Sequence, residues 1–231
     1  MAELIVALDV SSTAEVEQTV DRLGDAVSFY KIGLELFSAE GPAVVQAVKC
    51  RGKKVFLDLK LHDIPRTVER AVKAGAALGV DLMTIHSVGG KAMIRAAKDA
   101  ALACGPNAPK ILAVTVLTSL DQSDLADIGV AREMRAQVEA MGRLACENGA
   151  DGIVCSPKEV ANMRAALGPA ALLVTPGVRP AGADVGDQKR VATPGQAVKD
   201  GSTHLVVGRP ILEAADPRAA ARAIAAEMAD A

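Results

Sequence analysis

An aspartate, a lysine and a second aspartate follow one another at short intervals in an otherwise apolar part of the chain. Asp58 and Lys60 interrupt residues 55–61, which have the composition of a strand buried on both faces, and Asp63 comes just after them. Residues two apart on a strand point to the same side, so we expect the Asp58 carboxylate and the Lys60 ammonium to lie side by side. Buried charges are costly unless they are paired, and this arrangement suits either a structural ion pair or a catalytic site.

A second group of residues has the chemistry to bind a phosphate. In Gly208-Arg209-Pro210, the glycine allows close approach of the backbone to a ligand, and the guanidinium and the start of the following helix favour an anion. The long loop 176–191 adds Arg179 and Gln188, which are either ligands or solvated loop residues. Its glycines also suit a lid that closes over a ligand, with a plain surface loop as the alternative.

Eight apolar segments alternating with helical patterns would position these side chains. The expected strands are residues 4–8, 27–33, 55–61, 81–86, 110–117, 151–155, 171–175 and 204–207. The first expected helix follows the candidate caps Ser11-Ser12-Thr13 and reaches about Leu23. The other expected helices are residues 42–50, 65–78, a helix from just after Gly90 to about 104, 131–148, 157–167, 194–200, and a last alanine-rich helix. This alternation predicts one α/β domain over residues 1–231, a (β/α)8 TIM barrel, with a doubly wound open sheet as the alternative.

In a barrel of this kind the active site lies at the carboxyl ends of the strands. The polar residues that we expect there are Asp9, Lys31, Asp58, Lys60, Asp63, His86, Thr118, Arg179 and Arg209. A single structural ion pair would not need several strands to deliver charge to one opening, so the convergence favours a catalytic site. Of the other histidines, we expect His62 to face outward and His204 to be structural.

Composition excludes several classes of function. Aromatic residues make up only 2% of the chain, and the net charge of −2 comes with mixed signs and no basic stripe, so nucleic acid is not an expected partner. The four cysteines are scattered without a CxxC pair or a Cys/His cluster, which predicts no metal site and buried thiols in a reducing cytoplasm. No apolar run is long enough to cross a membrane.

The segment Asp58-Leu-Lys60-Leu-His-Asp63-Ile-Pro65 resembles the DxKxxD signature of the orotidine 5′-phosphate decarboxylase family. The other matching motifs, in the same order as in the family and closest to its bacterial type, are Ala7-Leu-Asp9, Lys31-Ile-Gly33, Leu117-Thr118-Ser119, Pro176-Gly177-Val178-Arg179, Gly186-Asp187-Gln188 and Val207-Gly208-Arg209-Pro210. The resemblance runs from residue 3 to the final helix. It implies cofactor-free decarboxylation of orotidine 5′-phosphate to uridine 5′-phosphate, the last step of de novo pyrimidine synthesis, by a homodimer whose sites lie at the interface.

The resemblance also implies a role for each matching residue. Lys60 would protonate C6 of the pyrimidine, and Asp58 would lie beside the substrate carboxylate. The partner subunit's site would be reached by Asp63, Ile64 and Thr67. The remaining roles are a charge chain completed by Lys31, ribose binding by Asp9, a pyrimidine contact from Thr118, and phosphate binding by Arg179, Gln188, Gly208 and Arg209.

Two other functions remain open at this point. The first is a metal-dependent decarboxylase or aldolase of the same barrel group that acts on a sugar phosphate. By resemblance, those enzymes carry a metal-binding carboxylate where this chain has Lys31, which argues against a divalent ion. The second is a non-catalytic barrel that binds a phosphorylated ligand, and the complete set Asp58, Lys60 and Asp63 argues against it.

Overall fold

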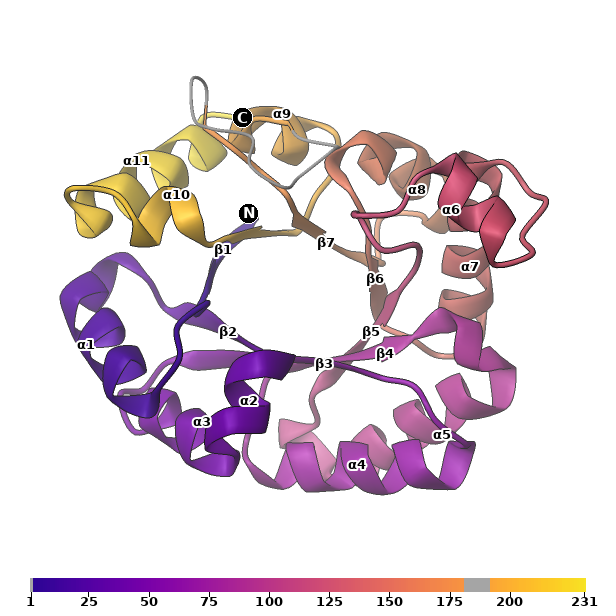
Figure 1. Ribbon diagram of the computed structural model, residues 1–231, viewed down its shortest axis with the longest axis horizontal. Coiled ribbons are helices and arrows are strands. Elements are labelled where there is room, and N and C mark those ends of the chain that lie inside the picture. Colours follow the sequence, from indigo (N-terminus) through magenta and orange to yellow (C-terminus); the bar gives the residue numbers. More distant parts are fainter. Residues whose placement is uncertain (1, 181–191) are drawn as a thin grey trace.

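Eight parallel strands form a closed ring in the computed structural model, which describes residues 2–180 and 192–231 (Figure 1). Each strand pairs with the next one along the chain, and the ring closes where β1 (Glu3–Ala7) pairs with β8 (His204–Val207). Helices surround the ring on its outside (Figure 1). This architecture is the predicted (β/α)8 TIM barrel, and the open-sheet alternative is wrong.

The bounds of the elements agree closely with the expected ranges for most of the chain. The remaining strands are β2 (Phe29–Gly33), β3 (Lys54–Leu61), β4 (Leu82–His86), β5 (Lys110–Val114), β6 (Gly152–Val154) and β7 (Leu172–Pro176). The α-helices are α1 (Thr13–Leu23), α2 (Leu34–Glu40), α3 (Pro42–Lys49), α4 (Pro65–Ala77), α5 (Gly90–Leu102), α6 (Gln122–Asp127), α7 (Met134–Glu147), α8 (Val160–Leu167), α9 (Pro194–Lys199), α10 (Arg209–Leu212) and α11 (Pro217–Ala229). Short 3-10 turns occupy Gly24–Ala26, Ser87–Gly89, Gly105–Asn107 and Pro157–Glu159.

Two helices lie where the sequence pattern predicted none. Helix α2 follows β2 directly and has 7 residues, and α6 lies in the loop after β5 and has 6. A helix of fewer than two turns is too short for the 3.6-residue period of apolar side chains to show. The side chain of Asp121 caps the start of α6 by accepting hydrogen bonds from the backbone N–H groups of Ser123 and Asp124, at 3.0 and 3.4 Å. The last alanine-rich segment is also two helices, α10 and α11, where one was expected.

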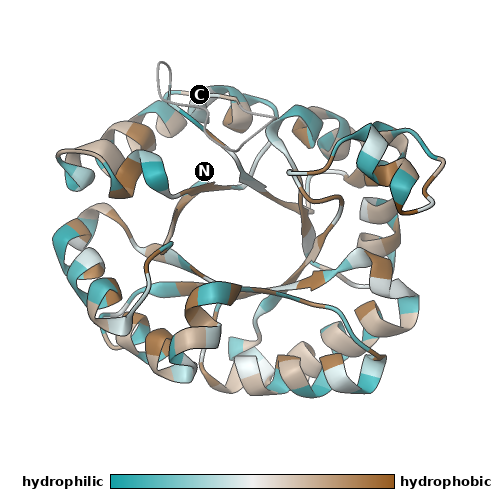
Figure 2. Cartoon of the chain, in the orientation of Figure 1, coloured by the Kyte–Doolittle hydropathy of each residue, from teal (hydrophilic) through white to brown (hydrophobic). Residues whose placement is uncertain are grey.

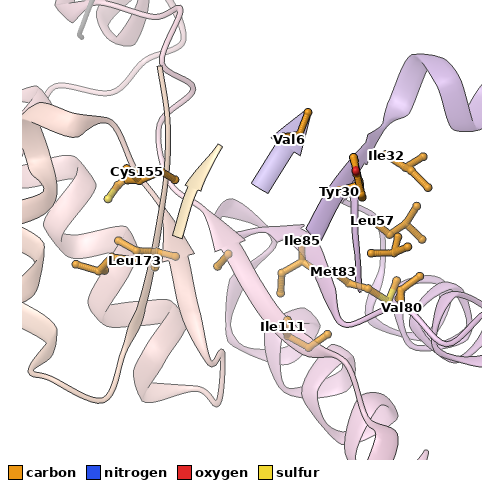
Figure 3. Close-up of a cluster of buried hydrophobic side chains, with 14 of the residues drawn as sticks. Val6, Tyr30, Ile32, Leu57, Val80, Met83, Ile85, Ile111, Cys155 and Leu173 are labelled. Atoms are coloured by element: carbon orange, nitrogen blue, oxygen red, sulfur yellow. The ribbon is translucent and has the colours of Figure 1, made fainter. Parts of the chain in front are cut away.

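Successive residues of each strand divide between two apolar layers. The residues that fill the inside of the ring are Ile5, Ala7, Phe29, Phe56, Leu82, Leu112, Val174 and Val206. Their neighbours along the strands, among them Val6, Tyr30, Leu57, Met83 and Leu173, belong to a second buried cluster that also contains residues of the surrounding helices (Figure 3). Figure 2 shows hydrophobic residues mainly on the ring and hydrophilic residues mainly on the surrounding helices. The interior is therefore a packed, mainly apolar core.

The amino-terminal end of the barrel is held by a repeated side-chain contact. Asp81, Asp151 and Thr203 each precede an even-numbered strand, and their side-chain oxygens accept hydrogen bonds of 2.7, 2.8 and 2.9 Å from backbone N–H groups of the preceding odd-numbered strand. Asp151 also pairs with Lys98 at 2.7 Å and with Lys110 at 3.4 Å. The side chains of Asp151 and Lys98 are 14% and 18% exposed, so solvent screens their attraction only in part.

Replacing Asp151 should destabilise the barrel without touching its other end. We expect Asp151→Ala to lower the free energy of unfolding by about 2 kcal/mol, because the Lys98 ammonium and one strand N–H lose their partner in a mostly buried position. Urea unfolding followed by circular dichroism measures the effect. Glu69→Ala is the control, since it breaks an exposed pair with Lys73 within α4 and should leave the urea midpoint almost unchanged. Equal midpoints for both variants would contradict the prediction.

Candidate active site at the carboxyl ends of the strands

The charged part of β3 is not a regular strand. Leu57 of β3 pairs with Met83 of β4, but the next pairing joins Leu61 to Ile85, so β3 has two extra residues between these points. Lys60 lies in this bulge with a φ of 52°, and it is the only non-glycine residue with positive φ in the described parts of the chain. The left-handed conformation is costly for a residue with a Cβ. The expectation of simple strand alternation through Lys60 is therefore wrong.

Asp58 and Lys60 nevertheless lie together as predicted. The Lys60 ammonium donates to Asp58 Oδ2 at 2.8 Å, and the two side chains are 35% and 13% exposed. Thr84 of β4 contacts both residues: its hydroxyl donates to Asp58 Oδ1 at 2.9 Å and accepts from the Lys60 backbone N–H at 2.9 Å. Sequence reasoning missed Thr84, because a threonine among apolar strand residues has the normal composition of a strand.

A second pair of opposite charges lies on the neighbouring strands. Lys31 of β2 donates to Asp9 Oδ1, just past β1, at 3.4 Å, and its side chain is 14% exposed whereas that of Asp9 is 60% exposed. The next inward position of β2, Gly33, pairs with Asp58 of β3. The barrel thus brings Asp9, Lys31, Asp58 and Lys60 to adjacent strand ends, as the sequence predicted.

Gly208 lies at the end of β8, next to Asp9, on the side of β1 opposite to β2. It follows β8, and a Cβ at this position would lie 2.9 Å from Asp9 Oδ2, which is too close for an ordinary contact. Arg209 begins α10 next to it and is exposed. Arg179 lies just past β7, where its N–H bonds to the Ala192 carbonyl at 3.0 Å. These residues therefore lie at the same end of the barrel as the charged pairs.

Other predicted site residues fall into three situations. Asp63 and Ile64 lie just before α4 and Thr67 lies in its first turn; all three are exposed, and the Asp63 carboxylate accepts a hydrogen bond from the Ile64 N–H at 2.7 Å. The sequence predicted that Asp58, Lys60 and Asp63 crowd one strand end. Within the described residues Lys60 pairs with Asp58, and no ion pair joins it to Asp63. Thr118 is partly buried in the loop after β5, a strand that ends three residues earlier than predicted. Gln188 lies outside the described residues.

Two histidines, the partly buried His86 and the exposed His62, lie together at the opening. The ring of His86, at the end of β4, lies 5.7 Å from that of His62, which is exposed as expected. Burial lowers the pKa of His86 below its usual range, and the nearby His62 and Lys60 lower this pKa further, against a smaller opposing effect of Asp58. His204 is buried at the opposite end of the barrel, against Glu3 and Phe29, which agrees with a structural role.

Metal clusters, disulfides and membrane-spanning helices are absent from the described residues. In residues 2–180 and 192–231, no three His, Cys, Asp or Glu side chains gather closely enough to hold a metal ion. All four cysteines are free thiols, and the expectation that they are buried holds only for Cys155, because Cys50 and Cys104 are exposed and Cys146 is partly buried. None of the helices in these ranges has the length and hydropathy of a membrane span.

A closed parallel barrel with paired ammonium and carboxylate groups at the carboxyl ends of its strands is the architecture of a TIM-barrel enzyme. Residues 2–224 match the family model described as orotidine 5′-phosphate decarboxylase / HUMPS family, and the chain belongs to this family.

Known proteins resemble the chain over almost its whole length. It is 53% identical to the orotidine 5′-phosphate decarboxylase of Moorella thermoacetica, over 98% of this chain and 92% of that protein. The identity to the enzyme of the same name from an Anaeromyxobacter species is 54%, over 97% of each chain. The crystal structure of orotidine 5′-phosphate decarboxylase from Lactobacillus acidophilus superposes with a TM-score of 0.89 at 41% identity, covering 99% of both chains. The crystal structure of an uncharacterized conserved protein from Geobacillus kaustophilus superposes with a TM-score of 0.86 at 38% identity, covering 97% of this chain and 99% of that one.

The lowered pKa of His86 has a measurable consequence. Because the folded state disfavours the charged imidazolium, His86 should titrate by NMR with a midpoint below about 6.5, and the free energy of unfolding should fall as the pH drops below that value, where the unfolded chain binds the proton more readily. His62→Ala removes one source of repulsion and should move the midpoint upward. A midpoint at or above 6.5 in the unmodified protein would contradict the prediction.

Proposed function

We propose that this protein catalyses the decarboxylation of orotidine 5′-phosphate to uridine 5′-phosphate and CO2 without a cofactor, in the de novo synthesis of pyrimidines. The relatives at 53% and 54% identity bear the name of this activity. The single observation that carries the proposal is the Lys60 ammonium, held 2.8 Å from the Asp58 carboxylate at the open end of the barrel. It supplies a positioned acid beside a negative charge, and the reaction needs both.

The chemistry assigns distinct tasks to the two residues. When the bond between C6 and the carboxylate breaks, CO2 leaves and the electron pair stays on C6, where the ring offers no position to delocalise it. The Lys60 ammonium stabilises this developing charge and then donates its proton to C6. The neutral amine regains a proton from solvent. Asp58 lies beside the substrate carboxylate and keeps the ammonium in place.

Neighbouring strand ends hold the rest of the nucleotide. Lys31 continues the row of alternating charges, Asp9 binds the ribose, and Thr118 contacts the pyrimidine. The contact between Lys31 and Asp9, 3.4 Å long, supports this arrangement because it puts a cation and a carboxylate next to the reacting pair. The phosphate is bound by Arg179, Gln188, Gly208 and Arg209.

Binding of the remote phosphate contributes to the rate as well as to affinity. Enzymes lower reaction barriers by about 8–23 kcal/mol, which is more than one lysine supplies. Energy from the phosphate contacts is available to orient the pyrimidine against Lys60 and to exclude water from the site. The absence of a side chain at Gly208, which leaves room beside Asp9, supports a close approach of ligand and backbone there.

The alternative function, a metal-dependent decarboxylase or aldolase, would need metal ligands at the same strand ends. It requires a carboxylate set that coordinates a divalent ion, whereas the position of β2 next to Asp9 is occupied by Lys31, 3.4 Å from the Asp9 carboxylate. An ammonium at this distance competes with a cation for the Asp9 carboxylate. The names of the relatives also favour the decarboxylase, so the alternative serves as the second outcome of the assay below.

An absorbance assay of orotidine 5′-phosphate decarboxylation tests the function and the acid together. We expect turnover that survives EDTA, and a loss of at least about a hundredfold in kcat for Lys60→Ala, because the positioned proton donor is gone. Lys73→Ala, which changes an exposed lysine on α4, is the matched control and should keep full activity. Absence of turnover in the unmodified protein would refute the proposal, and the assay would then be repeated with sugar phosphates and Mg2+.

We also propose that the protein acts in the cytoplasm as a homodimer whose two sites share residues. Three large apolar side chains follow consecutive strands at the site end of the barrel: Leu34, Ile64 and Val88 are 57%, 66% and 57% exposed. Exposed apolar side chains after three neighbouring strands support an interface with a second copy at this end of the barrel. In such a dimer Asp63, Ile64 and Thr67, which are exposed in the single chain, reach the partner's site.

Mixing two inactive variants tests this sharing directly. In a heterodimer of Lys60→Ala and Asp63→Ala chains, one site contains Lys60 of one chain and Asp63 of the other, so it is intact if Asp63 acts across the interface. Random pairing should then restore about a quarter of the unmodified activity. If Asp63 acts within its own chain, every site lacks one of the two residues and mixing restores nothing. Refolded homodimers of each variant are the controls.

A further inference from the structure

Thr84 occupies a position that connects both halves of the Asp58–Lys60 pair. It lies on β4 with no exposed surface, and its hydroxyl makes two hydrogen bonds of 2.9 Å, one to Asp58 Oδ1 and one from the Lys60 backbone N–H. A hydroxyl both donates and accepts, which is what these two partners require. No aliphatic side chain of the same shape would satisfy either of them.

The backbone of Lys60 explains why such a contact is needed. Its φ of 52° lies in a region that a lysine adopts only when its surroundings hold it there. The bulge removes Lys60 from the regular ladder between Leu57↔Met83 and Leu61↔Ile85, so its N–H has no place in those pairings. The bond to Thr84 replaces the missing ladder contact and fixes the direction in which the lysine side chain leaves the strand.

The same hydroxyl orients the carboxylate. Asp58 has two oxygens: Oδ1 accepts from Thr84, and Oδ2 accepts from the Lys60 ammonium at 2.8 Å. A carboxylate held at one oxygen does not rotate freely, so its other oxygen stays directed at the ammonium. The Thr84 hydroxyl thus positions Lys60 through a bond to its backbone N–H and positions Asp58 through a bond to its side chain.

We propose that Thr84 is a positioning residue for decarboxylation, which rests on the function proposed above. It does not contact the reacting atoms. Its hydroxyl keeps the strained β3 bulge in the one geometry that directs the Lys60 proton and the Asp58 charge at the same point. Catalysis is sensitive to such placement, since a displacement of about 1 Å can cost about a hundredfold in rate.

Three variants separate positioning from plain structural support. Thr84→Val keeps the shape and removes the hydroxyl, Thr84→Ser restores the hydroxyl, and Thr175→Val makes the same change at another fully buried strand threonine, which shares a hydrogen bond of 2.7 Å with Ser202. We expect Thr84→Val to lower kcat at least about tenfold with KM nearly unchanged, because the phosphate contacts at the far strand ends remain. Thr84→Ser and Thr175→Val should keep kcat within about threefold of the unmodified enzyme.

Several results would overturn the proposal. These are a Thr84→Val enzyme with unchanged kcat, a Thr84→Ser enzyme as slow as Thr84→Val, or an equal loss in Thr175→Val, which would indicate general destabilisation. If Thr84→Val does not fold, Thr84→Ala takes its place under the same criteria.

A crystal structure of the Thr84→Val protein separates this proposal from the function on which it rests. If the unmodified protein has no activity on orotidine 5′-phosphate, the proposed function fails, and the geometry still decides the role of Thr84. A negative φ at Lys60, or a distance above 4 Å between its ammonium and Asp58 Oδ2, supports positioning. An unchanged bulge with an intact ion pair overturns it.

Discussion

The pairing of the first strand with the last is the constraint on which the site depends. Hydrogen bonds between β1 and β8 close the ring and bring together residues some two hundred positions apart in the chain. At the carboxyl end of this seam, Gly208 lies so close to Asp9 that a Cβ would come within 2.9 Å of its carboxylate. The part of the site suited to an anion and the part that carries the paired charges are adjacent only because the ring is closed.

Charged side chains have different roles at the two ends of the barrel. At the amino-terminal end, Asp81 and Asp151 bond to lysines and to strand N–H groups, in geometry that satisfies each charge and supports the fold. At the carboxyl end, Lys60 adopts a strained conformation and keeps its ammonium partly open to solvent. The apolar interior lies between the two networks, so the strained conformation of Lys60 is separated from the ion pairs at the amino-terminal end.

Much of this structure could be predicted from the sequence, and the reasons for the failures are physical. The eight strands follow from the alternation of apolar segments with helices. The pairing of Asp58 with Lys60 is expected from their spacing, although a bulge and not regular alternation brings the two side chains together. Short helices such as α2 and α6 leave too few residues for a period to emerge. The bulge at Lys60 depends on pairing between two strands, which no single segment encodes, and Thr84 becomes meaningful only through that pairing. The exposed position of Asp63 likewise depends on how α4 leaves the barrel.

The equivalent contacts at the starts of β4, β6 and β8 bear on how the evolutionary origin of this barrel is traced. At three equivalent positions a side-chain oxygen accepts a hydrogen bond from a backbone N–H of the preceding strand. The residue is an aspartate at two of them, Asp81 and Asp151, and a threonine at the third, Thr203, and no repeat is visible in the amino-acid sequence. A carboxylate and a hydroxyl are interchangeable to the N–H group that they accept from. Duplication of a two-strand unit would therefore leave its trace in equivalent acceptors rather than in identical amino acids, and a search for ancient internal symmetry would have to compare bonding positions.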